Sequence, residues 1–339
     1  MDDFDLEAYL TRSRALDLEG IAWDDVPRHP LPTEAVRTLR YMQDIESHTI
    51  VYLRTLLSTR AIDDPEVATF LACWFYEETF HGRALARFLA EAGQDVVHRM
   101  RSRARLGQRL EARATGWVAR WWPEFVAVHM TWGAINELTT LTGYRRLATV
   151  AGHPVLTELL GRIMRDESRH FHFYFAQARR RLARSPRAAR VTRLLVDHFW
   201  APVGSGVQPA AETRFLAAYL FSGPEGRAAA RTVDTTIRGL PGFADARLLE
   251  AWIAGAAQGS SASPPCSSGP SASLGRRPWR TSRPSSSTTA SFGRRSWRRR
   301  TNFEPAHVRR PAAPLLRSLL PLHGRNPPRA EDHAIDEPG

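Results

Sequence analysis

Four long stretches of the chain carry apolar residues at steps of three and four, and each stretch has a glutamate inside its apolar stripe. They cover residues 34–60, 64–92, 123–151 and 154–182. This spacing predicts amphipathic helices, and the alternation typical of strands is nearly absent. Because burying a carboxylate costs several kcal/mol, four acids on four apolar faces constrain the fold strongly. The sequence therefore predicts an all-α chain built on a four-helix bundle.

Local signals mark the ends of these helices. Asp64 and Pro65 offer an N-cap and a proline at the first helical position, and Gly93 follows the second stretch. Gly152 closes the third stretch and Pro154 opens the fourth. Each predicted helix thus has a start or stop residue of its own.

Composition divides the chain into three parts. We expect residues 1–32 to form an N-terminal extension and residues 33–257 to form one domain, in which shorter helices interrupted by prolines pack on the end of the bundle. From residue 258 Ser, Pro and Arg dominate and the helical periodicity disappears. This predicts a disordered tail over residues 258–339, and the abrupt change suggests a shifted reading frame.

Charge and cysteine content exclude several classes of protein. The net charge is +12, but the tail alone holds 14 Arg against 5 acidic residues, so the rest gives little support to nucleic-acid binding. The 2 cysteines exclude a disulfide framework and a cysteine-based metal cluster. The sequence shows neither a signal peptide nor a run near the ~20 apolar residues of a membrane span. We expect a cytoplasmic protein.

Two Glu-x-x-His tetrads lie on the predicted helices, at Glu78/His81 and at Glu167/His170. A spacing of three places both side chains on one helix face, and here that face is the apolar stripe. On each of the other two helices a single glutamate lies within the apolar stripe, at residues 46 and 137.

Two divalent cations would balance these four carboxylates, while two neutral histidines add one nitrogen to each metal. This is the ligand pattern of ferritin-like di-iron and di-manganese bundles. Mixed carboxylate and imidazole ligands favour two irons, with manganese as the alternative. Any one of these residues taken alone fits a solvated acid or a hydrogen-bonded core histidine equally well, but their regular order on successive helices favours a metal site. The predicted ligands are Glu46, Glu78, His81, Glu137, Glu167 and His170.

Three segments resemble the iron-binding segments of the soluble acyl-carrier-protein desaturases: residues 74–82 (WFYEETFHG), 137–140 (ELTT) and 166–170 (DESRH). The likeness covers about residues 34–182. It implies a di-iron bundle in a homodimer, which uses O₂ and electrons from a ferredoxin to remove two hydrogens from an acyl chain carried on acyl carrier protein. The family usually has Arg before the first histidine, where this chain has Phe80.

The resemblance also suggests roles outside the ligand set. Thr140 matches a family threonine near the oxygen-binding side, although a threonine bonded to its own helix is the structural alternative. Metal-bound histidines usually donate their second ring N–H to a carboxylate. We expect Asp166 to serve His81 and Glu77 to serve His170, unless these acids are solvated.

An apolar channel should present the acyl chain to the cluster, and acidic carrier protein should meet a basic surface. The basic run between Arg99 and Arg120 is a candidate for that surface. Channel candidates are Trp74, Phe80, Met130, Trp132 and Phe173.

Two other functions fit the same ligands. One is a di-iron oxygenase that hydroxylates or N-oxidises a small metabolite, and the other is a non-catalytic ferritin-like protein that binds iron or serves as a scaffold. A deep apolar channel at the cluster favours the desaturase, a short polar pocket favours the oxygenase, and no cavity favours the scaffold.

Overall fold

The computed structural model describes residues 4–57, 59–96, 122, 124–205 and 208–259. The chain divides into two units, Met1–Ser268 and Gly269–Gly339, and every described residue lies in the first. The basic run between Arg99 and Arg120, and all but the first two residues of the predicted tail, lie outside the described residues.

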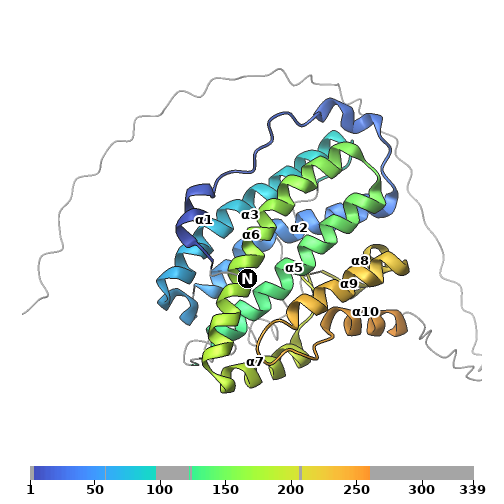
Figure 1. The fold of residues 1–339 in the computed structure, drawn as a ribbon. Coiled ribbons are helices and arrows are strands. Elements are labelled where there is room, and N and C mark those ends of the chain that lie inside the picture. Colours follow the sequence, from blue (N-terminus) through green and yellow to red (C-terminus); the bar gives the residue numbers. More distant parts are fainter. Residues whose placement is uncertain (1–3, 58, 97–121, 123, 206–207, 260–339) are drawn as a thin grey trace, which may run out of the picture. The chain divides into compact units, whose positions relative to one another are not determined.

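Four long helices form the bundle, as Figure 1 shows: α2 (Thr33–Leu56), α3 (Pro65–Glu91), α5 (Phe125–Ala151) and α6 (Pro154–Arg184). Helix α2 packs on α3, α5 packs on α6, and the two pairs meet along α3–α6 and α2–α5. Within the described part of the chain there is no β-strand, so the predicted all-α fold is confirmed.

The ends of these helices follow from their capping residues. The Asp64 carboxylate accepts hydrogen bonds from the backbone N–H groups of Glu66 and Val67 at the start of α3. Gly152 adopts φ 60° where α5 ends, a left-handed conformation that suits glycine. Helix α2 ends at Leu56, earlier than expected, because the Thr59 hydroxyl donates to the Leu56 carbonyl.

Shorter elements cover the bundle. Helix α1 (Leu6–Arg12) packs on α3, and the 3₁₀ helices η1 (Trp23–Arg28) and η2 (Arg60–Asp63) join it there. The C-terminal helices are α7 (Pro186–Phe199), α8 (Ala210–Phe221), α9 (Gly223–Ile237) and α10 (Leu248–Gly259). The sequence predicted that these helices lie on the end of the bundle. In the structure α7, α8 and α9 all contact α5, so they also cover the side of the bundle that α5 forms.

No helix in the described ranges combines the length and the apolar character that a bilayer span requires.

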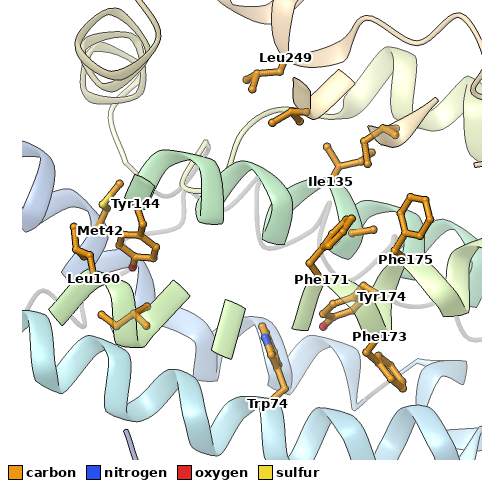
Figure 2. Packing of buried hydrophobic residues seen from close by; sticks show 14 of the residues in the cluster. Met42, Trp74, Ile135, Tyr144, Leu160, Phe171, Phe173, Tyr174, Phe175 and Leu249 are labelled. Atoms are coloured by element: carbon orange, nitrogen blue, oxygen red, sulfur yellow. The ribbon is translucent and has the colours of Figure 1, made fainter. Parts of the chain in front are cut away.

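Aromatic side chains fill the interior between the long helices. Figure 2 shows Trp74, Tyr144 and Tyr174, which come from three different helices, all within the bundle. The apolar periodicity of residues 34–60 would place Ile50 of α2 beside Glu46 on the inner face, but Ile50 is 41% exposed.

Helix α5 approaches α6 so closely at Gly133 that a Cβ there would overlap the ring of Tyr174. We therefore expect Gly133→Ala to lower the free energy of unfolding by about 1–3 kcal/mol through overpacking. Gly161→Ala is the matched control, because Gly161 lies in α6 and no atom stands within 4 Å of the place where its Cβ would lie. It should raise stability by roughly 0.5–1 kcal/mol, as alanine does within a helix. Urea unfolding of both variants measures the difference, and equal stabilisation would contradict it.

Candidate metal centre

The bundle brings all six predicted ligands together. None of the six side chains belongs to a residue that is more than 7% exposed. Their sources are α2 for Glu46, α3 for Glu78 and His81, α5 for Glu137, and α6 for Glu167 and His170. Four separate helices therefore converge on one buried point.

The six residues form two groups suited to metal ions, in each of which the ligand atoms lie within 4.8 Å of one another. We call them the His81 site and the His170 site. Glu78 and Glu167 belong to both sites, whereas each single glutamate belongs to one. The His81 site is Glu46, Glu78, His81 and Glu167, and the His170 site is Glu78, Glu137, Glu167 and His170.

The two shared carboxylates lie between the histidines. Glu167 places Oε1 3.2 Å from Nδ1 of His81 and Oε2 3.6 Å from Nδ1 of His170. Glu78 places Oε1 3.1 Å from Nδ1 of His170 and Oε2 4.0 Å from Nδ1 of His81. Each shared carboxylate thus turns one oxygen toward each site, which is the arrangement of a carboxylate that bridges two metals.

The outer nitrogens of the histidines meet a second layer of acids. Nε2 of His81 lies 3.1 Å from Oδ2 of Asp166, and Nε2 of His170 lies 2.7 Å from Oε2 of Glu77. Arg169 donates from one nitrogen to both acids, at 2.6 Å to Asp166 and 3.1 Å to Glu77. These contacts join the pairs that the sequence suggested. They fix each ring with its Nδ1 toward the shared carboxylates.

Three aromatic side chains hold carboxylates of the centre from outside the predicted set. Tyr144 donates to Oε1 of Glu46, and Trp74 Nε1 donates to Oε1 of Glu137 at 3.1 Å. Tyr9 of α1 donates to Oε2 of Glu77 at 2.7 Å. Trp74 lies four residues before Glu78 and Tyr144 lies seven residues after Glu137, so helical phase could have identified both. Tyr9 lies in the expected extension, and nothing in the sequence ties it to the centre.

Without a metal the cluster holds protons. Burial disfavours the charged imidazole, but the carboxylates around His81 outweigh it and raise the pKa of His81 to about 10. The pKa of His170 is likewise raised well above its usual value. Burial, reinforced by neighbouring acids, raises the pKa values of Glu46 and Glu137 well above the ordinary range. Burial opposes ionisation of Glu77 too, yet hydrogen bonds from His170 and Tyr9 lower its pKa to about 2.

The unpaired atoms of the centre test whether metal ions fit. Nδ1 of His81, Nδ1 of His170 and both oxygens of Glu167 are buried and have no hydrogen-bond partner in the described residues. A histidine that donates from Nε2 presents a lone pair at Nδ1. Here that lone pair faces a carboxylate oxygen at 3.1–3.2 Å, which is repulsive unless a proton or a metal ion lies between them. Two divalent ions meet this need, so the donor set fits them.

An apolar cavity of about 500 Å³ opens beside the centre. The four carboxylates of the predicted set lie in its wall, together with residues of α2, α5, α8 and the segment after α7. Some polar groups of the wall have hydrogen-bond partners: Tyr41 donates to the Val203 carbonyl at 2.7 Å, and Asn136 accepts from Trp200, behind the wall, at 3.1 Å. Much of the remaining wall is apolar, including Met42, Ile45, Leu216, Leu220 and Phe221.

The channel prediction is right in part. Trp74 and Trp132 line the cavity, but Phe80, Met130 and Phe173 do not. Met130 and Phe173 are fully buried in the core, and Phe80 packs on Tyr76 away from the cavity. Helical phase shows that a residue is buried, but not which interior space it faces.

Thr140 also lines the cavity, one helical turn after Glu137. Its neighbours Thr139 and Thr142 donate to carbonyls of their own helix, at 2.7 Å each. Thr140 makes no such bond within the described residues, so its hydroxyl is free to face the cavity.

Comparison with known proteins bears on this site. Residues 49–196 match the model of a family described as fatty acid desaturase. The match includes five of the six predicted ligands, and it confirms the resemblance drawn from the sequence. A search of curated proteins found no match to the chain.

Metal binding should release protons, because the ligands that hold them must give them up. The raised pKa values mean that His81 and His170 carry protons at pH 7 in the metal-free protein. We expect Co²⁺ added to the metal-free chain to acidify a weakly buffered solution. Its affinity should fall as the pH falls, by up to about tenfold per pH unit for each proton displaced. Titration at several pH values measures this, and a pH-independent affinity would contradict it.

Proposed function

We propose that the chain, whose residues 49–196 match the fatty acid desaturase family, is a di-iron, O₂-dependent desaturase acting on an acyl chain carried by acyl carrier protein. Family membership itself implies an oxidoreductase. The observation that carries the finer proposal is the apolar cavity whose wall includes the carboxylates of two adjoining metal sites. A saturated hydrocarbon chain matches such a wall, because it brings no polar group that needs a partner.

A C–H bond of a saturated chain has no acidic proton, so acid–base side chains alone cannot break it. Iron held by the six ligands would supply the one-electron and oxygen chemistry that the reaction requires. Iron is proposed over manganese because the mixed carboxylate and imidazole ligands suit a redox metal with open positions.

The chain's own residues have three tasks in this proposal. Tyr144 and Trp74 hold Glu46 and Glu137, which leaves these carboxylates fixed as single-site ligands. Because the polar groups of Tyr41 and Asn136 already have hydrogen-bond partners, they present no unsatisfied donor or acceptor to the acyl chain. Thr140 Oγ1 stands at the cavity and is suited to hold a proton there.

Several parts of the proposal rest on the sequence. A ferredoxin is proposed as the electron donor, and a homodimer as the working form, because the resemblance implies both. The acidic carrier protein would meet the basic run between Arg99 and Arg120, because opposite charges favour their association. A cytoplasmic location is proposed as well, because the 2 cysteines fit a reducing compartment.

Anaerobic loading with Fe²⁺, addition of acyl carrier protein bearing a saturated acyl chain, and exposure to O₂ with reductant test the proposal. Mass analysis of the released chain should show a product two hydrogen atoms lighter. A product one oxygen atom heavier would identify an oxygenase instead, and unchanged substrate with iron bound would favour the non-catalytic alternative.

A larger residue in the cavity should block the substrate without disturbing the metal. Ala217 of α8 lines the cavity and is buried, and Ala218 beside it is exposed. We expect Ala217→Phe to lower kcat/KM at least tenfold while leaving iron content unchanged. Ala218→Phe, the matched control, should behave as the unaltered chain. Equal activity of both variants would show that the acyl chain lies elsewhere.

A further inference from the structure

One side chain of the N-terminal helix enters the second layer of the metal centre. Tyr9 is 2% exposed, and its hydroxyl donates to Oε2 of Glu77, the same oxygen that meets Nε2 of His170 at 2.7 Å. Glu77 itself is fully buried. From this geometry we infer that Tyr9 is a positioning residue for the His170 site alone, and that it couples docking of α1 to metal binding there. The inference rests on the proposed metal centre.

The two sites differ in this second layer. Asp166, which serves His81, receives hydrogen bonds from His81 and Arg169, and no tyrosine hydroxyl of the described residues reaches it. Glu77 receives three donors: His170, Arg169 and Tyr9. Because a second-layer carboxylate orients its histidine and raises the basicity of that ligand, a change at Tyr9 acts directly on the His170 site and reaches the His81 site only through Arg169, which bonds both acids.

Helix α1 is held in place by apolar contacts as well as by this bond. The Tyr9 ring lies 5.2 Å from that of Phe70, and the Phe4 ring lies 5.2 Å from that of Phe173. Tyr9→Phe keeps the ring and removes only the hydroxyl, so α1 should stay docked. Glu77 would keep two of its three donors.

The test is titration of the metal-free, full-length chain with Co²⁺. The unaltered chain should bind two ions, and Tyr9→Phe should bind one of them about threefold to tenfold more weakly, a smaller loss than the 10–100-fold typical of a direct second-layer partner. Glu77→Gln is the positive control and should weaken the same ion further. Tyr76→Phe, on the exposed side of α3, is the matched control and should change neither ion.

The exchangeable Nε2 protons of the two histidines show which site has changed. In the Co²⁺-loaded chain each bound histidine gives its own paramagnetically shifted proton signal. Tyr9→Phe should shift the His170 signal and leave the His81 signal in place, and Asp166→Asn, which alters the partner of His81, assigns the two. Equal effects on both signals, or lower thermal stability with unchanged Co²⁺ affinity, would overturn the inference.

Coupling is reciprocal, so metal binding must also favour docked α1. Arg12 and Arg14 are exposed at the end of this helix and offer sites to trypsin. Co²⁺ should slow cleavage there in the unaltered chain and less in Tyr9→Phe; equal protection in both would contradict the coupling. Failure of the unaltered chain to bind Co²⁺ would instead remove the proposed metal centre itself.

Discussion

The buried charge of six side chains dominates this structure. Four carboxylates inside one bundle repel one another and lose their hydration, and two imidazole lone pairs add to the same field. A cation must neutralise them, whether a proton or a metal ion. The raised pKa values of both histidines show that protons neutralise the carboxylates when no metal is bound. Metal ions offer the alternative, because they can bind the Nδ1 atoms of the neutral histidines together with the oxygens of Glu167.

The centre has two different faces. Toward α8 and the segment after α7 it presents the four carboxylates, which lie in the cavity wall. On its other side the Nε2 atoms of the two histidines form hydrogen bonds with Asp166 and Glu77, and Arg169 donates to both of these acids. Neither histidine is among the residues that line the cavity. Carboxylates, which can change how they bind a metal, thus face the proposed substrate, while the rigid rings are anchored away from it.

The sequence predicted the bundle and the meeting of these six side chains inside it, because both depend on spacing along a helix. Asp64, Gly152 and Pro154 mark helix ends through backbone chemistry that acts within a few residues. The Glu-x-x-His spacing likewise places two side chains on one face wherever the helix lies. Contacts between distant segments carry no such local signal. Tyr9 reaches Glu77 across 68 positions, and Val203 meets Tyr41 across 162.

One departure from the family pattern connects these observations. The two tetrads are related by pseudo-symmetry, and Arg169 precedes the second histidine where Phe80 precedes the first. Phe80 turns outward onto Tyr76, so Arg169 alone bonds both second-layer acids. One guanidinium cannot neutralise two carboxylates, and the fully buried Glu77 needs the greater compensation. The Tyr9 hydroxyl provides a third hydrogen bond to that acid. The N-terminal helix therefore supplies part of the stabilisation that a second arginine would give.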